Sequence, residues 1–156
     1  MNSTTSTPNP IIFDLIALTK PRVNFLIIFT AIVGMLLAQD FNLNYSLMIY
    51  ASIGIYLAAS AAAVINQIVD QKIDAIMDRT KSRPLIKGNV TSKHAIYFSI
   101  VISLISTYIL YEYVNTITTV LTLFSIIVYS IIYSVYLKNL TSQNIVIGGI
   151  ACLLYT

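Results

Sequence analysis

The chain has 156 residues, of which 57% are hydrophobic and only 10% are charged, and its mean hydropathy is +0.81. So few charged side chains cannot cover the surface of a soluble domain, and the composition therefore favours an integral membrane protein. The formal net charge of +3 does not indicate a nucleic-acid partner here. In a membrane protein the position of each charge relative to the spans matters more than the total.

The chain begins with a polar stretch, residues 1–8, which we expect to be a disordered tail. Asn9 and Pro10 are typical of the start of a helix, and the apolar sequence "IIFDLIAL" follows them. This segment is too short to cross a bilayer and suits the membrane interface. The sequence "TKPRV" then leads into the first span, with Pro21 at the start of the helix.

Four uncharged segments are long enough to cross the hydrocarbon core of a bilayer, which takes about 17 to 25 residues. They are residues 23–39, 46–65, 95–111 and 117–137. A fifth apolar run, near 144–155, is too short to span, so we expect the chain to end inside a fifth transmembrane helix. The predicted fold class is all-α: a polytopic bundle of about four full spans plus a partial fifth.

All nine basic residues fall on the same side of the membrane if these spans alternate in direction. They are Lys20, Arg22, Lys72, Arg79, Lys81, Arg83, Lys87, Lys93 and Lys138. Loops rich in Lys and Arg stay in the cytoplasm, so the N-terminus and the loop 66–94 are predicted to be cytoplasmic. The opening residues resemble neither a secretory signal nor a transit peptide, and we expect a bacterial plasma (inner) membrane location.

The sequence "NQIVDQKIDAIMDRTKSRPLIKG", residues 66–88, holds eight of the fifteen charged residues of the chain. Asn66, Asp70 and Asp74 are spaced four residues apart, so on a helix their side chains share one face. Two carboxylates on one face at the bilayer surface repel each other unless a cation binds between them. Mg²⁺ prefers oxygen ligands and is usually held by one or two carboxylates together with substrate phosphates.

Basic residues follow these acids directly, at Arg79, Lys81 and Arg83, before Pro84 and Gly88 interrupt the helix. Arg binds phosphate oxygens with a two-pronged donor, and Lys acts as a point charge. Acids for a metal, bases for a phosphate and a membrane for an apolar tail together predict a site for an isoprenyl diphosphate. A cytoplasmic loop with solvated acids is the alternative. It explains the basic residues but not the register of the acidic ones.

The stretch 66–88 resembles the first Asp-rich motif of the UbiA superfamily of membrane prenyltransferases, N-x-x-x-D-x-x-x-D followed by R-T-x-x-R-P-L. The sequences "LTKPRV", "DAIMDRTKSRPL" and "YLKNLTSQNIVIGG" are similar to one branch, the protohaem IX farnesyltransferases or haem O synthases. The resemblance covers residues 11–150 and implies that residues 9–156 form the N-terminal half of a helical domain of this family, with a cavity between the helices.

The resemblance implies a reaction in which farnesyl passes from farnesyl diphosphate to a vinyl group of haem b, giving haem O. It implies that Mg²⁺ binds with the diphosphate, held by Asn66, Asp70 and Asp74. Arg79 and Arg83, with Lys81 behind them, would bind the diphosphate. Asn66 would also contact the substrate. Asp70, Asp74, Arg79 and Arg83 would be catalytic, because metal and arginines stabilise the leaving charge.

The implied partners are farnesyl diphosphate, haem b and the lipid bilayer, with a downstream haem A synthase or a second chain that completes the bundle as further candidates. The chain departs from the family pattern because it ends before the second Asp-rich motif, and "CLLYT" replaces the usual residues after "IVIGGIA". We therefore expect a premature stop, a frameshift or an incompletely predicted gene, and little or no transferase activity from this polypeptide alone.

Other functions stay open at this point. One is a UbiA-type enzyme that prenylates an aromatic quinone precursor, and another is a membrane fragment without a function of its own. A transporter or channel component is less consistent with spans whose interiors carry no charge. Outside the acidic stretch, the small residues at 58–63 predict close helix packing. Asn24 is interpreted as a helix-packing residue and His94 as an interfacial residue, not a haem ligand.

Overall fold

The computed structural model describes residues 11–38, 44–76, 78, 80 and 83–130. This part of the chain is helical and contains no strand. Its helices are α1 (Ile11–Leu18), α2 (Pro21–Ala38), α3 (Tyr45–Val69), α4 (Gln71–Asp74), α5 (Ser92–Tyr113) and α6 (Thr116–Ile127). Helices α2, α3 and α5 are long and apolar enough to cross a membrane, and α6 is a shorter apolar helix. The predicted all-helical membrane bundle is confirmed.

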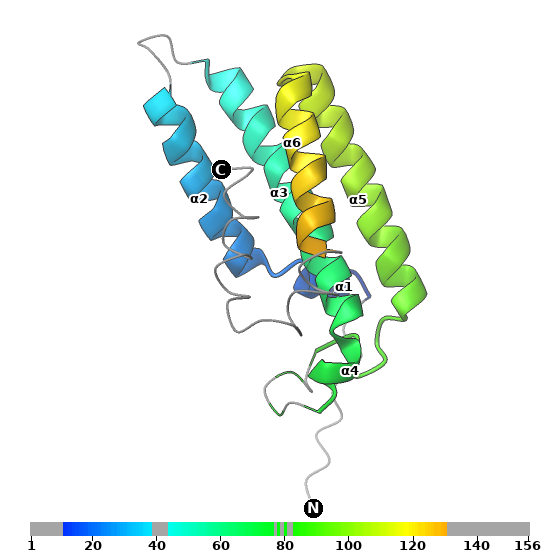
Figure 1. The fold of residues 1–156 in the computed structure, drawn as a ribbon. Helices are drawn as coiled ribbons and strands as arrows, with labels where there is room; N and C mark the ends of the chain where they lie inside the picture. Colours follow the sequence, from blue (N-terminus) through cyan, green and yellow to red (C-terminus); the bar gives the residue numbers. More distant parts are fainter. Residues whose placement is uncertain (1–10, 39–43, 77, 79, 81–82, 131–156) are drawn as a thin grey trace, which may run out of the picture.

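The helices α2, α3, α5 and α6 run side by side, and successive ones point in opposite directions (Figure 1). Helix α3 is central, because it packs against α2, α5 and α6. Helices α1 and α4 lie at the end of the bundle where α2 begins and α3 finishes (Figure 1). We call this the basic end, for the residues given below.

Helices α2, α3 and α5 overlap the predicted spans 23–39, 46–65 and 95–111. Helix α3 continues four residues past the predicted limit at position 65, to Val69. The fourth predicted span, 117–137, corresponds to α6 as far as the described residues reach. The predicted tail 1–8 and the partial span 144–155 lie outside the described residues.

Helix starts follow the capping residues of the sequence. The side chains of Asn44, Thr91 and Asn115 each accept a backbone N–H in the first turn of α3, α5 and α6. An N-terminal cap of this kind satisfies a donor that has no partner within the helix. Pro21 is the first residue of α2, as predicted, and Lys20 before it has a φ of 51° that turns the chain out of α1.

Small residues of α3 allow the helices to approach closely. The whole segment 58–63 is buried, which confirms the close packing expected from its composition. One turn earlier, Gly54 faces Leu110 of α5, and the Ser106 hydroxyl donates to the Gly54 carbonyl at 2.8 Å. A hydrogen bond to a backbone carbonyl of the facing helix requires the two backbones to lie close together.

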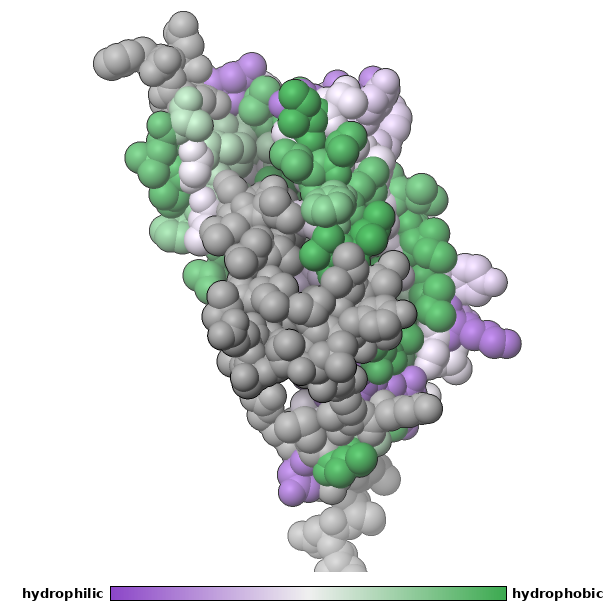
Figure 2. All heavy atoms as spheres, viewed as in Figure 1, coloured by the Kyte–Doolittle hydropathy of each residue, from purple (hydrophilic) through white to green (hydrophobic). Residues whose placement is uncertain are grey.

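The outer surface of the bundle is apolar. Figure 2 shows hydrophobic side chains over the middle of the helices, while hydrophilic ones lie mostly toward the two ends. Large exposed side chains occur on every long helix, for example Phe25 (66%), Leu37 (83%), Leu104 (65%) and Ile117 (73%). A surface of this kind is stable in a bilayer, where lipid replaces water around it.

The described basic residues gather at one end of the bundle. Lys20 and Arg22 flank the start of α2, Arg83 and Lys87 follow α4, and Lys93 is in the first turn of α5. Glu112 lies near the opposite end, in the last turn of α5. The described basic residues therefore lie on one side, as predicted from the spans, while Arg79, Lys81 and Lys138 lie outside the described residues.

Candidate functional site

The acidic row begins in the last turn of α3 and continues into α4. The Asp70 N–H donates to the Asn66 carbonyl at 3.0 Å, and the Asp74 N–H donates to the Asp70 carbonyl at 2.8 Å. These bonds span four residues each, so the helical register runs through the break between α3 and α4. Asn66, Asp70 and Asp74 therefore occupy successive turns, and all three are buried, with 7%, 5% and 5% of their surface exposed.

Helix α4 ends at the last residue of this row. The Thr80 hydroxyl donates to the Asp74 carbonyl at 2.8 Å and so satisfies one of the carbonyls left open at the helix end. Asp78 continues the spacing of four residues after Asp74, but it lies beyond the helix and is exposed. The helix thus ends before Asp78.

One of the predicted bases meets the acidic row. Arg83 Nη1 donates to Asp74 Oδ2 and forms an ion pair with it. The Asp74 side chain is 8% exposed and that of Arg83 is 27% exposed. A guanidinium carries five N–H donors, so an arginine bound to one carboxylate oxygen can still donate to a phosphate.

The segment 83–90, which carries Arg83, is a series of tight turns that we call the basic turn. Backbone bonds of 3.0 Å join Arg83 N–H to Thr80 O and Lys87 N–H to Arg83 O. Gly88 has a φ of +78°, a left-handed conformation that glycine adopts without strain. Pro84 and Gly88 lie within these turns, but the helix has already ended at Asp74, earlier than the interruption predicted at these two residues.

Burial fixes the basic turn to the bundle. Its Leu85 and Val90 belong to a core cluster with Leu18 of α1, Val64 of α3 and Ala95 of α5. All five are less than 5% exposed. The turn therefore packs against three different helices, which positions Arg83 beside Asp74.

The other predicted features of the site, two basic residues and a metal ion, are not seen directly in the structure. Arg79 and Lys81 lie outside the described residues, so their contact with a diphosphate stays a prediction. In the part of the chain that the structure describes, no three His, Cys, Asp or Glu side chains group as a metal site. The row offers two carboxylates and one amide. That set fits Mg²⁺ bound together with a substrate diphosphate, and it does not form a cage made of protein ligands alone.

Asn24 and His94 lie apart from the acidic row in their contacts. Asn24 is 2% exposed, and its amide donates to the Thr19 carbonyl and to the Ser60 hydroxyl, both at 2.9 Å. The bond to Ser60 fastens α2 to α3, which confirms the helix-packing interpretation, and the bond to Thr19 holds the turn before α2. His94 is exposed in the first turn of α5, with its ring nitrogen 2.6 Å from the hydroxyl of the capping Thr91.

Sequence reasoning missed the polar residues that surround the acidic row. Gln67 donates to the Leu18 carbonyl at 2.7 Å, and Asn89 donates to Asp14 at 3.1 Å. Each joins α1 to a segment that flanks the site. The one sign in the sequence was an acid, Asp14, within an otherwise apolar helix.

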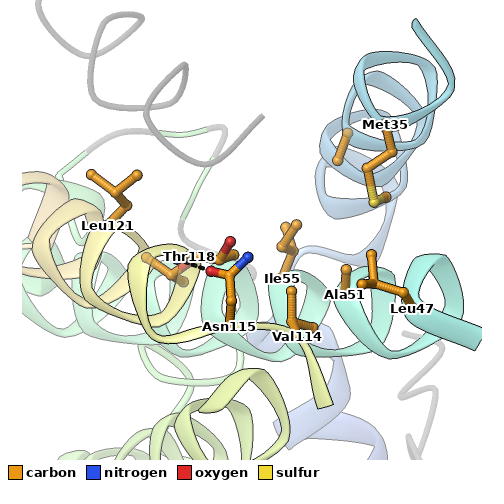
Figure 3. Close-up of a pocket in the computed structure, with 10 residues that line it drawn as sticks. Met35, Leu47, Ala51, Ile55, Val114, Asn115, Thr118 and Leu121 are labelled. Carbon is orange, nitrogen blue, oxygen red and sulfur yellow. Dashed lines mark hydrogen bonds between the residues drawn. The ribbon is translucent and has the colours of Figure 1, made fainter. Parts of the chain in front are cut away.

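A separate cavity of about 260 Å³ lies toward the opposite end of the bundle. Figure 3 shows Met35 of α2, Ala51 and Ile55 of α3 and Leu121 of α6 around it. Ile55 precedes Asn66 by eleven residues on α3, or roughly 16 Å at 1.5 Å per residue. The cavity is therefore distinct from the acidic row.

The chain is similar in sequence to several curated proteins. Three curated relatives, each called protoheme IX farnesyltransferase, come from Hahella chejuensis, Ruthia magnifica and Xanthomonas campestris. They are 48%, 51% and 53% identical to this chain over 138, 144 and 137 residues. The alignments cover 88%, 91% and 86% of this chain but 46%, 48% and 46% of the relatives. The chain thus spans about half the length of the relatives it matches.

No solved structure matches the chain. The profile of the UbiA prenyltransferase family matches residues 27–155, which include the acidic row and the basic turn. An apolar helical bundle, with paired acids and bases at one end, agrees with that match. The chain therefore belongs to the UbiA prenyltransferase family.

Proposed function

We propose that the acidic row and the basic turn form the diphosphate-binding part of a membrane prenyltransferase. The observation that carries this proposal is the buried Asp70–Asp74 row with Arg83 paired to Asp74, at the end of an apolar bundle. The substrate proposed is farnesyl diphosphate and the acceptor is haem b, as the names of the relatives suggest. The transfer reaction is assigned to the whole protein, and donor binding to the part described here.

The residues of the row are suited to hold the diphosphate through Mg²⁺. Asn66, Asp70 and Asp74 would supply oxygen ligands, and bound Mg²⁺ would neutralise charge on the diphosphate. Arg83 would donate to the diphosphate from the side of Asp74, with Arg79 and Lys81 as further donors. Because these groups are fixed before the reaction, they favour the state in which negative charge accumulates on the leaving group.

The reaction begins when the bond between C1 of farnesyl and the diphosphate oxygen breaks, and the electron pair leaves with the diphosphate. The π electrons of a haem vinyl group then form the new carbon–carbon bond to C1. Water adds to the remaining vinyl carbon and loses a proton, which gives the hydroxyl of haem O. The allylic cation must meet the vinyl group before it meets water, so an apolar environment favours transfer over hydrolysis.

The basic end is proposed to face the cytoplasm of a bacterial inner membrane. Lys20, Arg22, Lys87 and Lys93 lie there together, as the rule for positive loops requires. Farnesyl diphosphate would bind with its charged head at this surface and its tail among the helices. A downstream haem A synthase and a chain that supplies further helices are proposed partners.

The test is donor binding to the chain in lipid nanodiscs. We expect farnesyl diphosphate to bind in the presence of Mg²⁺, to lose affinity with EDTA and to be displaced by inorganic pyrophosphate. Binding that is indifferent to both would overturn the proposal. For the whole protein, incubation with haem b or with an aromatic carboxylic acid, followed by mass spectrometry, identifies the acceptor and separates haem O synthesis from prenylation of a quinone precursor.

A further inference from the structure

Helix α1 lies across the basic end with one side in the core. Its Leu18 is fully buried among Val64, Leu85, Val90 and Ala95, and its Asp14 is 7% exposed. The opposite side presents Ile12, Phe13 and Ile16, which are 49–68% exposed. An apolar outer face on a helix at the end of a membrane bundle suits the interface region of the bilayer.

Two hydrogen bonds tie α1 to α3, within the acidic row, and to the basic turn that follows the row. Gln67, directly after Asn66, donates to the Leu18 carbonyl at 2.7 Å, which satisfies an open carbonyl at the end of α1. Asn89 of the basic turn donates to Asp14 Oδ2 at 3.1 Å. The first bond reaches α3 just before the row's carboxylates, and the second reaches the turn that follows them.

The bond to Asn89 acts on the part of the chain that carries Arg83. The Asn89 N–H donates to the Pro84 carbonyl at 3.1 Å, so Asn89 closes the turn that begins beside Arg83. Gly88, next to Asn89, lies in open space, because a Cβ added to it would have no neighbouring atom within 4 Å. The basic turn is thus anchored by the polar Asp14–Asn89 bond to α1 and by the buried side chains of Leu85 and Val90.

We propose that Asp14 is a positioning residue for diphosphate binding, acting through Asn89 to hold the basic turn with Arg83 beside Asp74. The Asp14 carboxylate accepts from Asn89, whereas Arg83 pairs with Asp74, so the effect of Asp14 passes through the turn. This inference deepens the proposed function and rests on it. It assigns to α1 a role in the geometry of the site beyond its contact with the membrane.

The test compares Asp14→Ala, Asp14→Asn and Asn89→Ala in the full chain in nanodiscs. The probe is inorganic pyrophosphate with Mg²⁺, measured by calorimetry, and hydrogen exchange of residues 83–90 is followed in parallel. We expect Asp14→Ala and Asn89→Ala each to weaken binding by about five- to tenfold, since each removes a hydrogen bond involving a carboxylate. The double variant should lose no more than either single one, because both changes break the same bond.

Asp14→Asn keeps an acceptor oxygen for Asn89 and should bind pyrophosphate nearly as well as the unchanged chain. Glu112→Ala, at the opposite end of the bundle, is the matched control for loss of an acid. Faster exchange in residues 83–90, with unchanged exchange in the middle of α5, separates positioning from general unfolding.

Unchanged binding and exchange in Asp14→Ala would overturn the inference, as would equal losses in Asp14→Ala and Asp14→Asn with a lower unfolding temperature. If the unchanged chain binds no pyrophosphate, the proposed function fails, and the exchange data alone decide whether Asp14 holds the turn.

Discussion

A buried aspartate paired with an arginine is costly to disturb, because each partner offsets the desolvation of the other. Asp74 is in this situation, and Thr80 also fixes the backbone at the same residue. In the proposed function, the pair supplies the carboxylate and the guanidinium that a metal-bound diphosphate needs. At the scale of single residues, this is the contact from which the proposed chemistry is built.

Replacing Asp74 with Asn is expected to weaken Mg²⁺-dependent binding of farnesyl diphosphate by at least about tenfold, because one of the proposed metal ligands loses its charge. Arg83→Lys should weaken binding less than Arg83→Ala, since Lys keeps the charge but lacks the two-pronged donor. Binding by calorimetry in nanodiscs checks both changes, with Glu112→Gln as the control at the far end. An Asp74→Asn chain that binds farnesyl diphosphate normally would remove Asp74 from the site.

Asn24 has a structural role, so we expect its replacement to change stability. Asn24→Ala leaves the Thr19 carbonyl and the Ser60 hydroxyl without their partner, in a position that is 2% exposed. The free energy of unfolding should fall by about 1–3 kcal/mol. Thr30→Ala on the same helix removes an exposed hydroxyl bonded to the Ile27 carbonyl and should change stability little. Thermal unfolding in detergent measures both, and equal effects would contradict this account.

At the scale of elements, the spans were predictable because lipid imposes a simple requirement. Only long uncharged runs cross a bilayer, and helices are the way to satisfy their backbone groups. The acidic row was predictable because residues spaced four apart share one face of a helix. The break between α3 and α4 keeps this register, since Asp70 at the break has right-handed helical angles of φ −78° and ψ −4°.

Contacts between distant segments could not be predicted in the same way. Arg79, Lys81 and Arg83 are equivalent candidates in the sequence, and only the folded turn brings Arg83 onto Asp74. The bonds of α1 join residues 49 and 75 positions apart, Leu18 with Gln67 and Asp14 with Asn89. No periodic pattern encodes such pairs, because each depends on how the helices pack.

The contact of α3 with α5 yields a prediction about packing. A Cβ at Gly54 would lie 2.5 Å from Leu110 Cδ2 and 2.6 Å from its Cγ, so Gly54→Ala should destabilise the bundle by about 1–3 kcal/mol. Leu110→Ala should also destabilise, but the double variant should recover part of the loss, because the smaller side chain makes room. Ile53→Val, on the exposed face, is the control for unfolding measurements. Strict additivity of the two changes would argue against this contact.

The whole molecule is polarised along its helices. Its described bases, its acidic row and α1 share one end, whereas Glu112, the stacked rings of Tyr50 and Tyr113 and the apolar cavity lie toward the other. A charged substrate head would therefore meet the protein at one membrane surface only. The tail of that substrate would enter the bundle from the same end.

This polarity predicts which residues are accessible from each side of the membrane. In a chain whose single Cys152 is replaced by Ser, Lys87→Cys should react with an impermeant maleimide only in inverted vesicles, because we propose that the basic end faces the cytoplasm. Glu112→Cys should react only in intact cells whose outer membrane has been made permeable to the maleimide, since α5 carries residue 112 to the opposite end of the bundle. Both positions are exposed, so a lack of reaction reports the side of the membrane and not burial. Labelling of both cysteines from the same side would contradict the placement of residues 87 and 112 at opposite ends of the bundle. Labelling of residue 87 in intact cells and of residue 112 in inverted vesicles would keep the arrangement of the helices and place the proposed diphosphate site on the outer surface.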